Sequence, residues 1–260
     1  MQTRTFSLLA LSKGLVKSVL PEPILANLQL WRFARAPHAA IARAQWQRDQ
    51  QDRRDARVTE LKCQSMRGVR VNVGCGPNPT AGWVNLDISR RHPAVMYWNC
   101  AKGLPFNDGT VEAIYSEHFF EHLNYQSEAK HFLRECLRCL KPQGVLRIVV
   151  PDAGEYLRLY ATGDWSGLSA KRPLIKEGDH YRDCGLPAVY KTRMEFINSV
   201  FRQDGEHKYA YDAETLLLAL REAGFSDVSE TTYNISCDPN MAADTPRRKA
   251  DSLYVEGRGS

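Results

Sequence analysis

A short glycine segment and a carboxylate lie at the ends of two neighbouring predicted strands. Gly74-Cys75-Gly76 follows the apolar run Val69–Val73, and Asp87 stands near the end of the next predicted strand, Trp83–Ile88. A glycine segment at a strand end lets backbone N–H groups approach a ligand without obstruction from side chains. In a doubly wound sheet these strand ends are neighbours, and a carboxylate there accepts hydrogen bonds from a ribose diol. Together the two features predict a nucleoside-binding site.

The arrangement that holds a dinucleotide pyrophosphate is missing from this segment. That arrangement needs a third glycine that opens a full helix, so that the helix N-terminus faces the phosphates. Here Pro77-Asn78-Pro79 follows Gly76, and the ten residues between Gly76 and Asp87 are too few for a crossover helix and a strand. We therefore expect a ligand without phosphates, and a nicotinamide oxidoreductase is the least favoured interpretation.

Three histidines are candidates for acid–base chemistry. His118 follows the predicted strand Val111–Ser116, while His180 and His207 lie in a long segment between strands. A neutral imidazole can take a proton from a hydroxyl near neutral pH. For each of the three, packing in a pocket or a plain surface position stays an open alternative.

The spacing of His118 and His122, with Glu121 between them, also raises the question of a metal site. On a helix the two imidazoles would share one face. A structural or catalytic zinc site needs at least three protein ligands, and no third ligand is evident nearby. We therefore predict no metal site.

Strands alternate with helices from residue 69 onward. The predicted strands are 69–73, 83–88, 95–98, 111–116, 145–150, 228–235 and 253–256, and the predicted helices are 124–140 and 212–222. This alternation predicts an α/β fold with a doubly wound, mostly parallel sheet. Residues 152–211 form a long excursion with helical patterns at 153–161 and 191–202, which is typical of a lid or a binding segment.

The N-terminal segment, residues 1–68, carries the positive charge of the chain. It holds twelve Lys and Arg against five Asp and Glu, while the whole chain has a net charge of +5. The arginines at 43–57 lie in a stretch that is typical of helix, and the first 20 residues suit an amphipathic helix that ends at Pro21. Three interpretations stay open: a solvated helical face, an anionic membrane surface, or a nucleic acid.

Composition excludes several classes of protein. Hydrophobic residues make up 43% of the 260 residues and charged residues 25%, which is ordinary for a globular chain. No run of about 18 uncharged apolar residues predicts a membrane-spanning helix. Seven scattered cysteines do not suggest a secreted disulfide framework, and the N-terminus does not read as a signal peptide. We expect a cytoplasmic protein, with peripheral contact at the inner membrane surface as an open alternative.

Five ordered segments resemble the successive motifs of class I S-adenosylmethionine-dependent methyltransferases. They are Val71–Gly76, Gly82–Asp87, Leu104–Gly109, Ile114–Leu123 and Leu140–Leu146, and the late segment from His207 to Phe225 also fits. The resemblance covers residues 69–256 and is nearest to a bacterial branch found with cell-surface glycan biosynthesis. It implies a Rossmann-like methyltransferase domain over 69–260, with 152–211 as an acceptor-binding or lid insertion and 1–68 as a basic helical extension.

The resemblance also implies the cofactor S-adenosylmethionine and the residues that would bind it. Gly74, Cys75 and Gly76 would contact the aminocarboxypropyl part, Asp87 the ribose hydroxyls, and Ile88 the adenine, while Ser116 and Glu117 would approach the methionine part. Asn99, with Cys100 beside it, stands where the family commonly has Asp facing the adenine amino group. An amide oxygen can accept that hydrogen bond as well.

The expected reaction is methyl transfer to a small-molecule, sugar or lipid-linked glycan acceptor, at oxygen. The glycan part rests on the resemblance to the branch rather than on any residue. An RNA methyltransferase is one alternative, but residues 69–260 are slightly acidic and show no recognised RNA-binding module, so nucleic acid is not the expected partner. A non-catalytic protein that keeps the fold for binding or scaffolding is another. The sequence leaves the oligomeric state open.

Overall fold

The structure, a computed structural model, describes residues 39–171, 175–177, 180–182 and 190–259. The amphipathic helix predicted for the first 20 residues lies outside this described part. The chain divides into two units, Met1–Arg54 and Asp55–Ser260. Helix α2 (Ala39–Gln64) runs through the division and contains the arginine-rich stretch, which confirms the helix predicted there. Within the described ranges, no helix is both long and apolar enough to cross a membrane.

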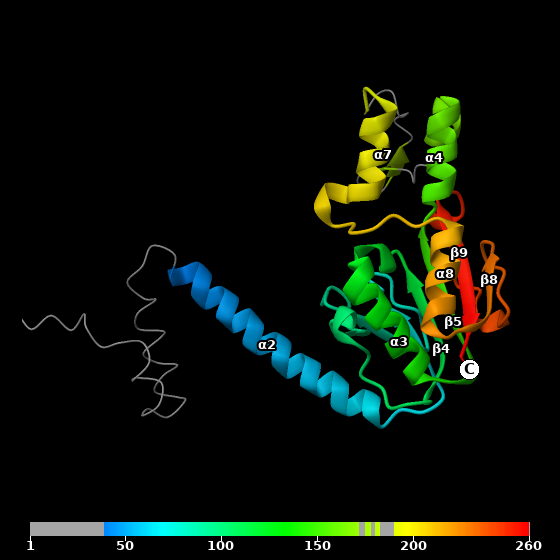
Figure 1. The fold of residues 1–260 in the computed structure, drawn as a ribbon. Helices are drawn as coiled ribbons and strands as arrows, with labels where there is room; N and C mark the ends of the chain where they lie inside the picture. Colours follow the sequence, from blue (N-terminus) through cyan, green and yellow to red (C-terminus); the bar gives the residue numbers. More distant parts are fainter. Residues whose placement is uncertain (1–38, 172–174, 178–179, 183–189, 260) are drawn as a thin grey trace, which may run out of the picture. The chain divides into compact units, whose positions relative to one another are not determined.

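Seven strands of the described chain form one sheet in the order β3-β2-β1-β4-β5-β9-β8 (Figure 1). They are β1 (Val69–Val73), β2 (Val84–Asp87), β3 (Val95–Tyr97), β4 (Val111–Glu117), β5 (Leu140–Pro151), β8 (Ser226–Thr231) and β9 (Ser252–Arg258). The first five are parallel, and β9 is antiparallel to both of its neighbours, β5 and β8. This confirms the doubly wound, mostly parallel sheet that the sequence predicts.

The order of the strands places a switch point between β1 and β4. β2 and β3 lie on one side of β1, and β4 and β5 lie on the other. The carboxyl ends of β1 and β4 are therefore neighbours, with Val73 paired with Ser116. Ligands of open α/β sheets bind at such a switch point, outside the carboxyl ends of the strands. The glycine segment, Asp87 and His118 all follow strands that end at this edge.

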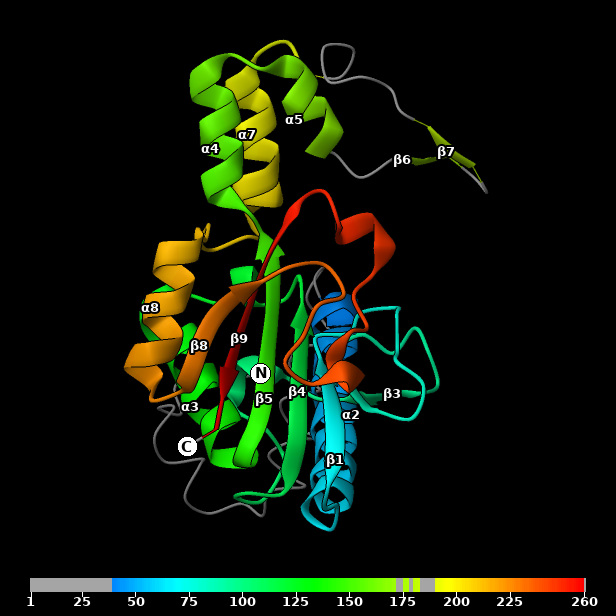
Figure 2. The same cartoon turned by 90° about the vertical axis from the view of Figure 1, so that its right-hand side faces the viewer.

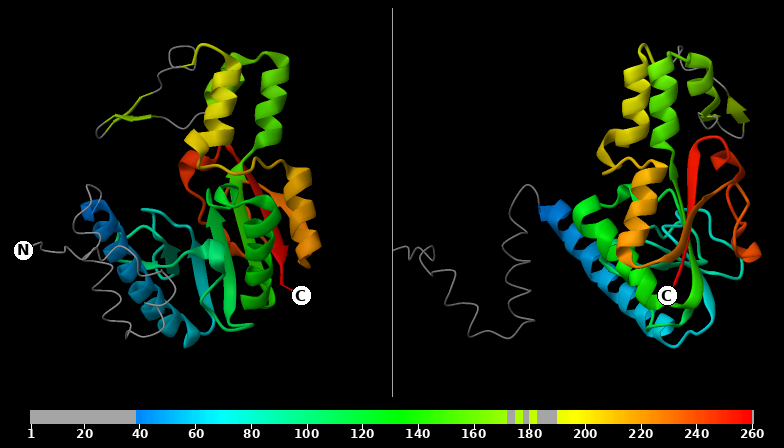
Figure 3. Two further views of the ribbon diagram at one scale, coloured as in Figure 1. Left: turned by 60° about the vertical axis from the view of Figure 1, so that its left-hand side comes forward. Right: turned by 45° about the vertical axis from the view of Figure 1, so that its right-hand side comes forward.

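One face of the sheet is covered by α3 (Lys130–Cys139) and α8 (Ala213–Ala223), which pack against each other (Figures 1 and 3). Buried side chains of the two helices, such as Phe132 and Leu216, join one core cluster with Val71 of β1. Asp212 begins α8, since its carboxylate accepts the N–H of Thr215. Asp is one of the residue types favoured at this capping position.

The opposite face of the sheet is covered by the loop between β8 and β9. Met241 of this loop packs with Tyr115 and Tyr254 in a second core cluster. Arg147 of β5 is fully buried beneath the loop and donates to Asp244 at 2.9 Å and to Glu256 at 2.8 Å. Its guanidinium also donates to the carbonyl oxygens of residues 232 and 235. Because Asp244 is also buried, this charged network fixes the loop to the sheet.

The described parts of residues 152–211 include two helices, α4 (Ala153–Thr162) and α7 (Arg193–Arg202), that lie beyond the carboxyl end of β5 (Figure 2). The segment also contains α5 (Trp165–Lys171) and the strand pair β6 (Ile175–Glu177) and β7 (His180–Arg182). Tyr156, Leu168 and Phe196 are buried in a cluster of their own. The helical patterns predicted at 153–161 and 191–202 are confirmed by α4 and α7. The insertion therefore has its own small core and is not an irregular loop.

The helix predicted over residues 124–140 is shorter and divided. A wide π-helical turn, η3 (Tyr125–Ala129), precedes α3, and α3 ends at Cys139. The strand after it begins at Leu140 and not at Val145, because Leu140 already pairs with Val111 of β4 before the ladder shifts register. The strand predicted over 228–235 also differs, since β8 runs from Ser226 to Thr231.

We expect Arg147→Met to lower the free energy of unfolding by about 3–5 kcal/mol, because it leaves two buried carboxylates without their cation. Chemical denaturation monitored by circular dichroism measures the change. Lys141→Met is the matched control: Lys141 forms a part-exposed ion pair with Glu112, so about 1 kcal/mol or less is expected. Equal losses in the two variants would mean that the buried network does not hold the loop.

Candidate functional site

The glycine segment after β1 forms a tight loop that only glycine permits at its first position. Gly74 has φ +65°, and a Cβ there would lie 2.5 Å from the side chain of Phe119. The N–H groups of Gly74 and Cys75 donate to the carbonyl of Leu86, which ties the loop to β2. The segment therefore presents backbone rather than side chains at the switch point, as the sequence predicts.

Asp87 fixes the other side of this loop. Its Oδ2 accepts the N–H of Gly76 at 2.9 Å, and its Oδ1 accepts the N–H of Ser89 at 2.6 Å. Each carboxylate oxygen has a further lone pair, so the group can still accept from a diol. Ile88, the next residue, is 60% exposed, and so its side chain is open to a flat apolar ligand.

Asn99 and Cys100 have different surroundings. The Oδ1 of Asn99 accepts the N–H of Ala101 at 3.1 Å and caps the short helix η1 (Cys100–Lys102). One lone pair of this oxygen is thereby used by the backbone, which leaves one for a ligand. Cys100 is buried in the core, and burial raises the pKa of its thiol well above the usual value.

Ser116 and Glu117 end β4 at the switch point. Ser116 is fully buried, and its hydroxyl has no hydrogen-bond partner among the described residues. Glu117 accepts the hydroxyl of Tyr115 at 2.7 Å and the N–H of Thr245 at 2.9 Å, and it is also bonded to the Thr245 hydroxyl. The hydrogen bonds of Glu117 therefore connect the end of β4 to the loop that precedes β9.

The glycine segment, the end of β4 and the loop before β9 enclose a hollow that we call the glycine-loop pocket. Its lining includes Gly74, Cys75, Gly76, Glu117, His118 and Arg248. The other predicted cofactor residues are not part of its lining; they are Asp87, Ile88, Asn99, Cys100 and Ser116. The carboxylate of Glu117 and the guanidinium of Arg248 thus face one space beside the glycine backbone. Such a pair can bind a zwitterionic ligand, because the guanidinium donates to an anionic group and the carboxylate accepts from a cationic one.

His118 stands at the turn after β4 in the left-handed conformation, with φ 51°. Its Nε2 lies 2.8 Å from the hydroxyl of Ser252, and that hydroxyl donates to Asp251 at 2.6 Å. Since the Ser252 proton is used by Asp251, Nε2 of His118 is the donor to Ser252. Burial lowers the pKa of His118 to about 3, so the imidazole is neutral at neutral pH and a weak base.

A second hollow, the insertion pocket, lies between the turn after β4 and the inserted segment. It is lined by three aromatic side chains, Tyr156, Tyr190 and Phe196, and by polar groups that include Gln203, His207 and Asp251. His118 and Arg248 line this pocket and the glycine-loop pocket alike. The two pockets therefore meet at these two side chains.

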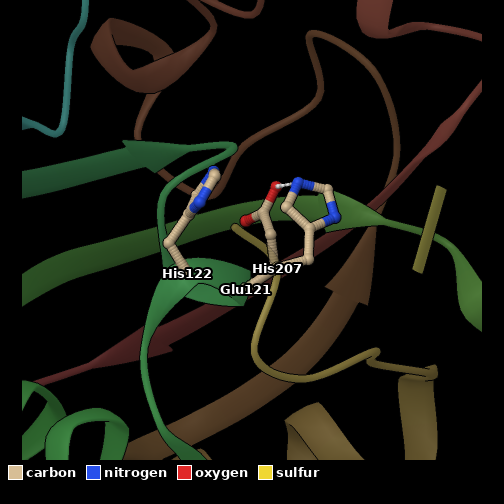
Figure 4. A group of neighbouring side chains, drawn as sticks. All are labelled: Glu121, His122 and His207. Atoms are coloured by element: carbon tan, nitrogen blue, oxygen red, sulfur yellow. Dashed lines mark ion pairs between the residues drawn. The ribbon is translucent and has the colours of Figure 1, made fainter. Parts of the chain in front are cut away.

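Glu121 and His207 lie together although 86 positions separate them in the chain. Glu121 is 1% exposed and has His118 Nδ1 at 3.3 Å and His207 Nε2 at 3.9 Å from its Oε1. Burial raises the pKa of Glu121 and lowers that of His207. His122 lies on the other side of the carboxylate (Figure 4). The reason given above for predicting no metal, the lack of a third ligand, does not hold for this arrangement.

The other predicted candidate, His180, lies in β7, paired with Glu177, and its side chain is outside the described part of the chain. Its catalytic role stays a prediction. The sequence analysis did not single out Arg248, Asp251 or Ser252, which line or adjoin both pockets. The signal for them was the charged cluster just before the last predicted strand.

One comparison with known proteins gives a family match. Residues 71–148 match the family model described as a methyltransferase domain. A comparison with curated proteins gives no match.

One similar solved structure is a chain from a complex between the Haloferax volcanii Trm112 methyltransferase activator and a methyltransferase. The two sequences are 14% identical, and the match covers 83% of this chain and 95% of that chain with a TM-score of 0.42. A methyltransferase from Thermotoga maritima is 16% identical, with 84% and 95% covered and a TM-score of 0.42. One from Archaeoglobus fulgidus is 15% identical, with 81% and 94% covered and a TM-score of 0.43.

The match to the methyltransferase domain falls on the strands and loops that build the glycine-loop pocket. Over residues 71–148 the chain carries a methyltransferase domain, and methyl transfer with S-adenosylmethionine as the cofactor is the activity that this match supports. The residues present fit this cofactor, because the loop at Gly74 has no room for a Cβ and Asp87 keeps lone pairs for a diol. When bound, the cofactor supplies a methyl group on a positively charged sulfur.

We expect Asp87→Ala to weaken S-adenosylmethionine binding by about 1–3 kcal/mol, because charge-assisted hydrogen bonds to the ribose are lost. Titration calorimetry measures the change, and NAD is expected not to bind the unchanged protein. Asp108→Ala is a matched control, since that exposed carboxylate pairs with Arg138 away from the pocket. Unchanged affinity in a folded Asp87→Ala protein would contradict the assignment of the ribose site.

Proposed function

We propose that the chain transfers the methyl group of S-adenosylmethionine to a hydroxyl oxygen of a sugar or a lipid-linked glycan. In this proposal the glycine-loop pocket holds the cofactor and the insertion pocket holds the acceptor. The observation that carries it is that His118 and Arg248 line both pockets, because a methyl donor and an acceptor must meet at one point.

The cofactor side of the proposal uses the residues that the resemblance singled out. The backbone at Gly74, Cys75 and Gly76 contacts the aminocarboxypropyl part of the cofactor, and Asp87 binds the ribose. Ile88, Asn99 and Cys100 lie at the adenine end. Ser116 and Glu117 lie at the methionine end. The buried Ser116 hydroxyl without a partner supports this, since such a group commonly has a ligand or water as its partner.

The acceptor side rests on the lining of the insertion pocket. Aromatic rings from Tyr156 and Phe196 give flat apolar surfaces, while Gln203 and Asp251 give hydrogen-bonding groups around them. A sugar ring has apolar faces and a rim of hydroxyl groups, so it is complementary to such a lining. Arg248, whose buried Nε has no hydrogen-bond partner within the described chain, is suited to the phosphate of a lipid-linked glycan.

His118 is the residue we assign to the acceptor hydroxyl. An acceptor bound in the insertion pocket would take the place of Ser252 or Glu121 beside one ring nitrogen. Its low pKa makes His118 a weak base, so its main contribution is to orient the hydroxyl toward the methyl group. His207 lines the same pocket and His180 lies in the same insertion, and we keep both as further candidates for contact with the acceptor.

For the compartment we propose the cytoplasm, with peripheral contact at the inner membrane surface when the acceptor is lipid-linked. Every cysteine that the structure describes has a free thiol, which supports a reducing environment. The basic arginines of α2 give a surface that is attracted to anionic lipids. A vesicle-binding assay with anionic and neutral lipids tests the membrane part separately from the reaction.

The proposed acceptor is tested with labelled S-adenosylmethionine and three acceptor fractions: lipid-linked glycans, soluble nucleotide sugars, and RNA. We expect label in one of the two sugar fractions, as an O-methyl group located by mass spectrometry. Label in RNA alone would overturn the acceptor class and favour the RNA methyltransferase. Cofactor binding without label in any fraction would favour the non-catalytic alternative.

We expect His118→Asn to lower kcat about 10²-fold, which is the order of the loss when a reacting group is misplaced by about 1 Å. Asn tolerates the left-handed backbone at this position, so the variant tests the imidazole and not the turn. Affinity for S-adenosylmethionine should change little, which calorimetry checks. If kcat stays within a few-fold while the KM of the acceptor rises, His118 serves in binding only and the assignment to the transition state is wrong.

A further inference from the structure

We propose that Glu121, His122 and His207 bind a divalent zinc ion at the edge of the insertion pocket. One ligand atom from each of these residues lies within 4.8 Å of the other two (Figure 4). Two imidazoles and one carboxylate form a ligand set that zinc takes in catalytic sites, with a fourth position left open. The inference concerns metal binding and does not depend on which acceptor is methylated.

The state of the Glu121 carboxylate is the strongest argument. Glu121 is 1% exposed, and neither of its oxygens accepts or donates a hydrogen bond within the part of the chain that the structure describes. Buried carboxylates of folded proteins are paired, hydrogen-bonded or bound to a metal. The nearest groups are the imidazole nitrogens of His118 and His207, at 3.3 and 3.9 Å. A cation between the carboxylate and the imidazoles would satisfy it.

The two imidazoles are oriented as metal ligands usually are. His207 Nδ1 lies 2.6 Å from the carbonyl oxygen of Val200, and His122 Nδ1 lies 3.2 Å from that of Glu206. A carbonyl only accepts, so both Nδ1 atoms carry the proton and both Nε2 atoms keep a lone pair. A ligating histidine almost always donates its other N–H to such a group, which fixes the tautomer and the ring.

The backbone that carries the three residues is held together without a metal. Glu121 and His122 belong to the short helix η2 (Phe120–His122), and His207 begins the segment that leads to α8. The carbonyl of Glu121 accepts the N–H groups of Lys208 and Tyr209, at 2.8 and 3.2 Å. Ligands of a tetrahedral zinc ion lie about 3.4 Å apart, given zinc–ligand distances of about 2.0–2.1 Å. The three ligand atoms now lie within 4.8 Å of one another, so a bound zinc ion would draw them closer together.

The ligand types favour zinc over the hard cations. Calcium and magnesium prefer oxygen ligands and would take the carboxylate but not two imidazoles. His207 also lines the insertion pocket, so a zinc ion held by these residues would lie at the edge of the space where an acceptor would bind. If the proposed function is correct, a hydroxyl group of the acceptor would fill the open fourth position of the zinc ion; this one statement rests on the proposed function.

Competition of the full-length protein with a chromophoric chelator for Zn²⁺ tests the site. We expect one zinc ion per chain, bound without S-adenosylmethionine or acceptor, and at least tenfold weaker binding in both His122→Ala and Glu121→Gln. His92→Ala is the matched control, because His92 is exposed and its Nδ1 accepts only the N–H of Ala94. Substitution by Co²⁺ should give visible d–d bands without a thiolate charge-transfer band.

Three results would overturn the proposal: no zinc bound, zinc bound equally by the control and both variants, or a thiolate band that assigns the metal to a cysteine. His122 is half-buried, so its variant stays informative if the change at buried Glu121 impairs folding. Circular dichroism and S-adenosylmethionine binding check that each variant is folded. Because the titration contains neither cofactor nor acceptor, failure of the metal site and failure of the proposed methyl transfer are distinguished.

Discussion

The close approach of Gly74 to Phe119 is the constraint on which the candidate site depends. Parallel strands β1 and β4 end side by side, so the loop after one must pass directly against the turn after the other. A Cβ at Gly74 would lie 2.5 Å from the Phe119 side chain, and Phe119 packs in turn on Phe132 of α3 with ring centroids 5.5 Å apart. The glycine loop thus packs directly against the turn that contains His118, in its left-handed conformation, and Phe119.

The second condition is the charged network that fixes the loop before β9. Arg147 is buried with Asp244 and Glu256, and Asp244 lies next to Thr245, which is bonded to Glu117. The same loop carries Arg248 and Asp251, which line the insertion pocket. The buried ion network therefore does more than stabilise the sheet. It also holds the loop before β9 at the carboxyl ends of the strands, where residues of this loop line both pockets.

The sequence predicted the fold and the cofactor loop because their signals are local. Apolar runs, the glycine segment and Asp87 each lie within one strand and its following turn, and short-range patterns are sufficient to find them. The arrangement around Glu121 has no such signal. His207 is 86 positions away in the sequence. It lies beside Glu121 because the chain leaves the insertion at this point and runs back to the sheet, where the N–H groups of Lys208 and Tyr209 donate to the carbonyl of Glu121. The loop before β9 was missed for the same reason, since its role appears only in three dimensions.

The metal proposal and the proposed role of His118 are linked through one contact, between His118 and Glu121. Nε2 of His118 donates to the Ser252 hydroxyl, so Nδ1 carries the lone pair and lies 3.3 Å from the Glu121 carboxyl group. The ring of His118 therefore lies between the proposed metal ligand Glu121 and Ser252, which is bonded to Asp251 of the insertion pocket. A shift of the ring proton to Nδ1 would leave the lone pair on Nε2, where it can accept a hydrogen bond from a hydroxyl of the acceptor. The two proposals therefore meet at the tautomer of one imidazole.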